Sequence, residues 1–333
     1  MKENEILSEH ENLIDEEEKQ DYSIVRSVDK RANYGRRKET IFYVSLIALP
    51  FIHYLIFYVY VNLNSVLMAF KEIQVVNGIV NVKFGFSNFI QIIEDVVYGV
   101  AMKEMIGNSL LFYVINLVIG LPLALFFSFY VYKKYYFSEF FRVMLFLPSI
   151  VSAIVLAEMY TLLFSDAYFD IMAMFGVEVE FAPIVDPLMK RTLVIVFNLL
   201  LSFGTNVIMY ASAMTRIPVS VIEYAELEGV SPLREFWSIT LPLVYPTITT
   251  FLVVGVTSIF TNQMNLYAFY GNNAGYEVKT IGYELFRLVD IGQGISSAYY
   301  YPAALGLLCT FIVVPITLIV KSLLNKFDPD VSF

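Results

Sequence analysis

The sequence predicts an all-α membrane protein with six transmembrane helices, and its composition and hydropathy carry this prediction. The 333 residues are 58% hydrophobic and only 16% charged, and the mean hydropathy is +0.65. Soluble globular domains are typically about 45–50% apolar and about 25% charged. A hydrocarbon core of ~30 Å requires about 20 apolar residues per helix. Six stretches meet this requirement: residues 41–63, 108–132, 143–164, 192–214, 244–265 and 303–321.

The segment before the first span, residues 1–40, is expected to lie in the cytoplasm. Acidic residues are dense in its first 21 positions, where large apolar residues are few, and this favours a mobile or weakly helical segment. Lys and Arg concentrate on the cytoplasmic side of membrane helices. Six of them lie close to the start of the first span: Arg26, Lys30, Arg31, Arg36, Arg37 and Lys38. With six spans, both termini are then cytoplasmic.

The remaining loops agree with this orientation. The loop between spans two and three is basic at Lys133, Lys134 and Arg142, whereas the loop after span three is acidic at Asp166, Asp170, Glu178, Glu180 and Asp186. We therefore expect one six-span domain over residues 41–325, which contains a polar cytoplasmic loop at residues 216–243. A short cytoplasmic tail follows at residues 326–333.

Polar side chains cluster in the fourth and fifth spans. Uncharged amides and hydroxyls are costly in lipid unless they face protein or a water-filled cavity. They also suit the binding of sugar hydroxyls, because their hydrogen bonds are neutral and directional. Packing between helices is the alternative role. The residues concerned are Asn198, Ser202, Thr205, Asn206, Thr257, Ser258, Thr261, Asn262, Gln263 and Asn265.

Two titratable groups lie at depth in the predicted spans, Glu158 and His53. A carboxylate in a membrane helix suggests a proton site or a ligand contact, although Glu158 also fits an interfacial position and His53 a packed, hydrogen-bonded one. A proton-coupled secondary transporter that uses both is the alternative function. Such folds often contain inverted repeats, and no convincing repeat is seen. Cys309 is the single cysteine, and no His, Cys and carboxylate cluster has metal-ligand spacing.

The segment from Glu223 to Pro242 is polar and predicts two short helices joined by a sharp turn. Pro218 or Ser220 can open the first helix. Ser220 and Glu223 have the spacing of a capping box, which would place Glu223 at the third helical position. Gly229 fits the position after a helix end, where a positive φ is required. Ser231 and Pro232 then fit the N-cap and the first residue of a second helix.

This segment resembles the cytoplasmic loop of ABC importer permeases. Their pattern is E-A-A, three residues, Gly, nine residues and I-x-L-P, and the spacing here is the same, with Tyr224 at one alanine position. In that family the loop docks on the ATPase subunit. The resemblance thus assigns ATPase coupling to Glu223, Ala225, Gly229, Ile239, Leu241 and Pro242.

Four further segments resemble the carbohydrate-type permeases, in particular the maltose- and lactose-type members. They are Gly85 to Phe89, Asn108 to Leu110, Phe141 to Pro148 and Tyr301 to Gly306. In maltose-type permeases the sugar contacts lie early in span three, midway along span four and late in span five. Carried over by position, these contacts fall on Ser149, Asn198, Leu201, Ser202 and Asn262.

The resemblance implies a permease subunit of a bacterial inner-membrane ABC importer for carbohydrates, with oligosaccharides as expected cargo and alternating access as mechanism. The sequence has no G-x-x-x-x-G-K-[ST] motif, so ATP hydrolysis belongs to a separate chain, and neither enzymatic activity nor a cofactor is expected. The implied partners are a second, homologous permease subunit, a cytoplasmic ABC ATPase dimer, an extracytoplasmic sugar-binding protein and membrane lipid. The net charge of −9 does not suggest nucleic acid.

Overall fold

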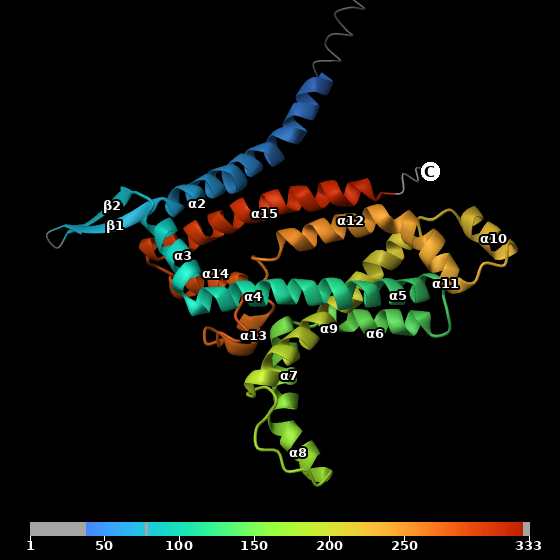
Figure 1. Cartoon of the computed structure of the whole chain (residues 1–333). Helices are drawn as coiled ribbons and strands as arrows, with labels where there is room; N and C mark the ends of the chain where they lie inside the picture. Colours follow the sequence, from blue (N-terminus) through green and yellow to red (C-terminus); the bar gives the residue numbers. More distant parts are fainter. Residues whose placement is uncertain (1–37, 77–78, 329–333) are drawn as a thin grey trace, which may run out of the picture. The chain divides into compact units, whose positions relative to one another are not determined.

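The computed structural model describes residues 38–76 and 79–328, which are mostly helical (Figure 1). Most of the predicted N-terminal segment and the end of the predicted tail lie outside the described residues. The chain divides into two units, residues 1–65 and residues 66–333. Five helices are long and apolar enough to cross a membrane, and a bent pair of helices makes a sixth candidate. The predicted helical membrane fold is therefore confirmed.

The first candidate span is one helix from Lys38 to Ala69, 32 residues long. It includes a π-helical stretch, η1 (Tyr54–Tyr60), followed by α2 (Val61–Ala69). The helix extends beyond both ends of the predicted span at 41–63. Its apolar side chains are largely exposed, which is expected of a helix whose surroundings include lipid.

A β-hairpin follows this helix and was not predicted. Its strands are β1 (Lys71–Val76) and β2 (Ile79–Phe84), paired antiparallel with Lys71 opposite Phe84. Both strands are rich in Val and Ile, residues that favour a pleated surface, so the signal was present in the sequence. The side-chain amide of Asn88, in α3 (Ser87–Tyr98), donates hydrogen bonds to the carbonyls of Ala69 and Lys71 at 3.2 and 2.8 Å. Through Asn88, the segment from Gly85 to Phe89 thus connects α3 to the end of α2 and the start of the hairpin.

The second and third spans differ from their predicted form. The second runs from Val100 to Tyr132 as one 33-residue helix, which comprises α4 (Val100–Ile115), the π-helical η2 (Asn116–Gly120) and α5 (Leu121–Tyr132). The third is broken. The helix α6 (Ser138–Ile150) and the segment that contains α7 (Ala153–Phe164) and α8 (Asp166–Met174) meet at 99°. Extended backbone at Val151 and Ser152 ends the first helix. The predicted stretch at 143–164 therefore falls within this bent pair and not within one continuous helix.

The fifth span also departs from expectation. A continuous helix runs from Pro232 to Thr257, so the span begins inside the predicted loop and ends eight residues before the predicted end at 265. This helix comprises α11 (Pro232–Glu235), the π-helical η3 (Phe236–Thr240) and α12 (Leu241–Thr257). The remaining helices are α9 (Pro187–Met214), α10 (Val219–Leu227), α13 (Leu266–Tyr270), α14 (Ile281–Ile291), η4 (Ser296–Tyr299) and α15 (Tyr300–Lys326).

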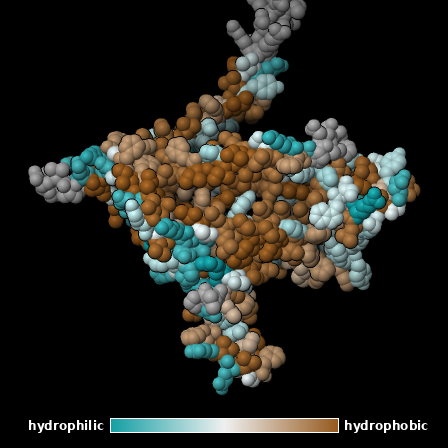
Figure 2. All heavy atoms as spheres, in the orientation of Figure 1, coloured by the Kyte–Doolittle hydropathy of each residue, from teal (hydrophilic) through white to brown (hydrophobic). Residues whose placement is uncertain are grey.

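Close helix packing organises the second unit. At Gly204, in α9, a Cβ atom would lie 1.7 Å from the carbonyl oxygen of Leu145, in α6. Only glycine allows the two backbones to approach this closely. A buried cluster joins α5, α9, α12 and the loop before α12, with Met214, Phe236 and Val244 among its members. Outside this core, Figure 2 shows a broad apolar surface over α4, α5, α12 and α15.

Candidate functional site

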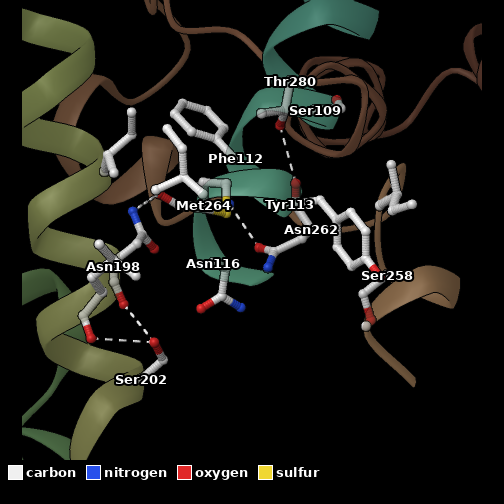
Figure 3. A pocket seen from close by; sticks show the side chains of 15 residues that line it. Ser109, Phe112, Tyr113, Asn116, Asn198, Ser202, Ser258, Asn262, Met264 and Thr280 are labelled. Carbon is white, nitrogen blue, oxygen red and sulfur yellow. Dashed lines mark hydrogen bonds between the residues drawn. The ribbon is translucent and has the colours of Figure 1, made fainter. Parts of the chain in front are cut away.

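A cavity of about 230 Å³ lies between the second span, α9 and the segment after α12 (Figure 3). Its wall combines amides and hydroxyls with aromatic and aliphatic side chains, and it contains no Asp, Glu, Lys, Arg or His. The lining residues are Ser109, Phe112, Tyr113, Ile115, Asn116, Ile195, Asn198, Leu199, Ser202, Gly255, Ser258, Ile259, Asn262, Met264 and Thr280. Concave sites with a few convergent polar groups are typical of small-molecule binding.

An irregular segment, residues 258–265, forms one wall of this cavity. Met264 and Asn265 have φ angles of 54° and 53°, in the left-handed region that non-glycine residues seldom adopt. The carbonyl of Asn262 accepts a hydrogen bond from the hydroxyl of Thr280 at 3.0 Å. Non-helical backbone at membrane depth is tolerated where it is buried in protein or lines a cavity. Asn262 thus lies in this segment, beyond the end of the fifth span.

Asn198 holds the irregular segment against α9. Its Nδ2 donates to the carbonyls of Val194 and Met264 at 2.9 and 2.8 Å, and its Oδ1 accepts from Nδ2 of Asn265 at 2.8 Å. The hydroxyl of Ser202 donates to the backbone carbonyl of Asn198 at 2.9 Å. Both amide protons of Asn198 are therefore used inside the protein, which supports the packing role for this residue.

The side-chain amides of Asn262 and Asn116 differ from that of Asn198, because their N–H groups are not used in hydrogen bonds to described residues. The Oδ1 atom of Asn262 accepts from the backbone N–H of Met264 at 2.8 Å, while its Nδ2 donates to no other described residue. Figure 3 shows that nitrogen facing the open space, with the amide of Asn116 directed toward the same space from η2. The amide of Asn116 likewise has no hydrogen bond to another residue that the structure describes. These two side chains have donors available for a ligand.

The cavity contains three of the five predicted sugar contacts, Asn198, Ser202 and Asn262. On α9, residues 198 and 202 are four apart and share a face. Leu201 is not among the residues that line the cavity. Ser149 lies in the last turn of α6, where its hydroxyl donates to the carbonyl of Phe146 at 2.7 Å. Ser149 is not among the residues that line the cavity, and the chain bends by 99° just after this turn.

Asn116 lines the cavity but was not among the predicted sugar contacts, all of which fell on the third, fourth and fifth spans. The signal was available, since Asn116 is an amide inside the apolar stretch 108–132. Neighbouring Asn108 has a structural role: it is 2% exposed, and its Nδ2 donates to the carbonyls of Tyr276 and Lys279 at 3.1 and 2.9 Å. The Asn108 to Leu110 motif therefore fixes the chain that leads into α14.

The polar loop contains the turn expected at Gly229. Its φ is +67°, and two hydrogen bonds close the end of α10: Val230 N–H to the carbonyl of Ala225 at 3.0 Å, and Gly229 N–H to that of Glu226 at 3.1 Å. This pair of bonds defines a Schellman motif. The helix begins after Pro218, which is its N-cap. Glu223 is therefore not at the third helical position, its side chain is exposed, and the capping-box interpretation is wrong.

The second half of the loop does not form a separate helix. Thr240 and Leu241 have helical dihedral angles, so η3 continues directly into α12. Pro242 lacks a backbone N–H and lies at the start of α12, next to the widened π turn. Ile239, Leu241 and Pro242 are half-buried in this joint. Of the six predicted coupling residues, only Glu223 and Gly229 are exposed.

A buried ion pair fastens the loop to the second span. The ammonium of Lys133, at the end of α5, lies 3.0 Å from Glu235 and 3.3 Å from Glu226. The Lys133 and Glu235 side chains are 15% and 4% exposed, whereas that of Glu226 is 66% exposed. Burial disfavours the charged ammonium, but the hydrogen bonds and charges of the two carboxylates outweigh it and raise the pKa of Lys133.

Comparison with known proteins gives a consistent result. Residues 110–333 match a family described as binding-protein-dependent transport system inner membrane component. The arabinooligosaccharides transport system permease protein AraP of Bacillus subtilis is 23% identical over 290 residues, which cover 85% of this chain and 88% of AraP. The polygalacturonan/rhamnogalacturonan transport system permease protein YteP of the same organism is 22% identical, with coverages of 86% and 89%. The sn-glycerol-3-phosphate transport system permease protein UgpA of Yersinia pestis is 27% identical, with coverages of 71% and 78%.

Solved structures show the same fold. A bacterial alginate ABC transporter in complex with an alginate pentasaccharide-bound periplasmic protein contains a chain that matches with a TM-score of 0.70 at 20% identity. The match covers 86% of this chain and 95% of that one. A second structure, of a transporter that imports the acidic polysaccharide alginate, matches with a TM-score of 0.69 at 19% identity.

Proposed function

This chain belongs to the family of binding-protein-dependent transport system inner membrane components, and we propose that it is the permease subunit of an ABC importer for carbohydrates. Oligosaccharides are the proposed substrate class, because relatives named for oligo- and polysaccharide transport match most of the chain. The cavity supports this proposal, since amides, hydroxyls and aromatic rings are the groups that bind sugars.

One observation carries the mechanism: a single helix joins the polar loop to the cavity. It runs without a break from Pro232 to Thr257, 26 residues, or about 39 Å at 1.5 Å per residue. Gly255, near its far end, and Ser258, just beyond, line the cavity. A displacement of the loop would therefore move the cavity wall with it. This connection supports alternating access, in which ATP hydrolysis by a separate chain drives the movement.

The surface of the loop supports the proposed contact with an ATPase dimer. Glu223 is exposed in α10, and large apolar side chains are exposed around the Gly229 turn, which is typical of a protein interaction site. These are Tyr224, Leu227, Leu233 and Trp237, at 70%, 83%, 67% and 56% exposure. In this proposal residues 216–243 form the coupling loop of a domain over 41–325, and both termini are cytoplasmic. A second permease and an extracytoplasmic sugar-binding protein complete the importer.

No observation favours the proton-coupled alternative. Glu158 is exposed on α7 and does not line the cavity. His53 belongs to the first unit, where its ring lies 4.7 Å from that of Phe57. In addition, no group of three or more His, Cys, Asp or Glu within the described residues could hold a metal ion. The cavity wall offers neutral polar and aromatic groups, which suit the binding of a ligand.

Purification of the native complex tests the proposal. We expect an ATPase with a P-loop to co-purify, and ATP hydrolysis in the reconstituted complex to rise when a sugar-loaded binding protein is added. A matched preparation with Gly229→Pro should keep the chain in the membrane but lose this stimulation. A complex without an ATPase that transports in response to a proton gradient would favour the alternative function instead.

A further inference from the structure

The wall of the cavity carries no formal charge. None of its lining residues is Asp, Glu, Lys, Arg or His. A carboxylate or phosphate that enters such a site loses part of its hydration without gaining a cation, which disfavours its binding. Hydroxyl groups face no such penalty, because neutral amides and hydroxyls replace their hydrogen bonds to water. The wall contributed by this chain therefore favours an uncharged ligand.

The nearest cation in the sequence is already paired. Lys279 precedes the lining residue Thr280, but its ammonium lies 3.6 Å from Glu284 and 5.1 Å from the centre of the Tyr276 ring. Its side chain is 12% exposed. Arg287 pairs with the same carboxylate of Glu284. Moving Lys279 to an anion in the cavity would leave Glu284 with one partner fewer in a buried site, which is costly.

The available donors converge on one part of the cavity. Nδ2 of Asn262 and the amide of Asn116 are directed toward the same open space (Figure 3) and donate to no other described residue. Asn116 begins the π-helical η2, and π-helical turns are frequent at functional sites. Asn198, by contrast, uses both of its amide protons within the protein. The side-chain N–H groups of Asn116 and Asn262 are thus available to donate hydrogen bonds to a ligand.

An apolar surface accompanies these amides. Phe112 and Tyr113 line the cavity, and the absence of a Cβ at Gly255 lets the Tyr113 ring approach α12, since a Cβ there would lie 3.2 Å from Cε2 of Tyr113. A sugar ring presents hydroxyls at its edge and C–H groups on its faces. The two available amides match the hydroxyls of an uncharged sugar, and the aromatic rings match its C–H faces.

We propose that this cavity selects uncharged sugars over uronates and phosphorylated sugars, and that Asn116 and Asn262 are the residues that recognise their hydroxyls. The proposal rests on the proposed carbohydrate function and deepens it. The family does not decide the charge of the substrate, because its members include one named for arabinooligosaccharides, one for polygalacturonan and one for glycerol 3-phosphate.

Binding of matched trisaccharides tests the proposal. Each pair differs only in charge, for example trigalacturonate and the galactotriose in which every carboxylate is replaced by a CH₂OH group, with gluco- and arabino-configured sugars in the same panel. Saturation-transfer NMR on the purified permease–ATPase complex, without the binding protein, reports selectivity of the membrane site alone. We expect neutral sugars to bind at least about tenfold more tightly than uronates.

Two variants test the named amides. Asn262→Asp keeps an oxygen that accepts from the Met264 N–H but removes the donors, so binding of the neutral sugar should fall about tenfold or more. Asn325→Asp adds the same charge at an exposed position of α15 and should leave binding unchanged. Asn116→Lys places a cation in the cavity and should shift the preference toward uronates.

The outcomes separate this proposal from the function on which it rests. Tighter binding of uronates by the wild-type complex would overturn the charge selectivity but leave the carbohydrate function in place. Unchanged selectivity in both cavity variants would overturn the role of the two amides. Absence of binding by every sugar in the panel would overturn the carbohydrate function and the proposal together. The wild-type comparison decides the selectivity even if a variant fails to assemble.

Discussion

The ammonium of Lys133 lies 3.0 Å from a carboxylate oxygen of Glu235, and this contact joins the end of α5 to the start of the helix that leads to the cavity. The other oxygen of that carboxylate, Oε1, is buried without a hydrogen-bond partner in the described part of the chain. Lys133 also contacts Glu226, whose side chain is mostly exposed. The Lys133 ammonium therefore forms ion pairs with one buried and one exposed carboxylate of the same loop.

We expect the two carboxylates to differ strongly in their contribution to stability. Glu235→Gln leaves a largely buried ammonium with only its exposed partner and should lower the stability of the complex by roughly 3 kcal/mol. Glu226→Gln removes a solvent-exposed pair and should cost less than about 1 kcal/mol. Thermal unfolding of the purified complex measures both. Equal losses in the two variants would show that burial does not decide the strength of these contacts.

Replacement of Gly229 should abolish uptake without preventing membrane insertion. Its φ of +67° cannot be adopted by proline, which also lacks the N–H that bonds to Glu226. Gly229→Asn should be milder, because asparagine enters the left-handed region more readily. Gly107→Ala, in α4 where a Cβ would meet no atom within 4 Å, is the matched control. Normal uptake by Gly229→Pro would show that the turn is not required.

Charge reversal at Glu223 should weaken retention of the ATPase. The side chain is exposed and the helix begins at Val219, so Glu223 does not cap α10. A pull-down should therefore show a larger loss for Glu223→Lys than for Glu223→Gln. Glu94→Lys makes the same charge change at an exposed position of α3, outside the loop, and serves as the control. Equal retention by all variants and the wild type would remove the docking role.

Alanine at Asn198 should impair assembly, whereas alanine at Asn262 should impair transport. Asn198→Ala leaves the carbonyl of Met264 and the amide of Asn265 without their partner, at about 1–3 kcal/mol for each group that stays buried, whereas the Val194 carbonyl keeps its helical bond from the backbone of residue 198. Asn262→Ala removes one internal bond, to Met264 N–H, and the free donor. Size-exclusion profiles and uptake assays distinguish the two effects. Normal transport by both variants would place the substrate path elsewhere.

Acid should destabilise the region around α14 through Glu284. Burial alone would raise the pKa of this carboxyl, but the hydrogen bond and charge of Arg287, together with Lys279, outweigh burial and hold the pKa below its ordinary value of 4.5. A group whose pKa is lowered by folding adds stability above its unfolded pKa, and this is lost as the pH falls through the folded value. As the pH falls below 4.5, the melting temperature should therefore decrease less in Glu284→Gln than in the wild type. Glu94→Gln, which removes an exposed carboxylate, should not.

The sequence predicted the fold where a local signal fixes the backbone. Gly229 was placed correctly because a helix end that requires positive φ selects glycine. Each of the six apolar stretches overlaps one of the five candidate spans or the bent pair of helices in the described residues, because the length of a span follows from bilayer thickness. The length of an apolar stretch does not show where the helix bends or ends. The bend after Ile150 and the helix end at Thr257 were therefore not predicted.

The candidate site was predictable only in part, because its parts come from distant segments. Asn198 and Ser202 share a face of α9, and spacing alone brings them together. Asn116 joins them only through packing of the second span against α9, which no local pattern reports. The role of Asn198 also depended on the structure, since its partners Met264 and Asn265 lie in a segment expected to be helical.

The π-helical turn at Phe236–Thr240 has a consequence for how the loop faces its partner. Hydrogen bonds in such a turn span five residues in place of four, so the turn holds about one residue more than an α-helix would. Successive α-helical residues are rotated by roughly 100° about the axis. Deleting one residue here would keep the helix intact. It would rotate the Gly229 turn by roughly 100° about the helix axis relative to Gly255. In the proposed importer, the number of residues in this joint would therefore set the direction in which the loop faces the ATPase, independently of the side chains that make the contact.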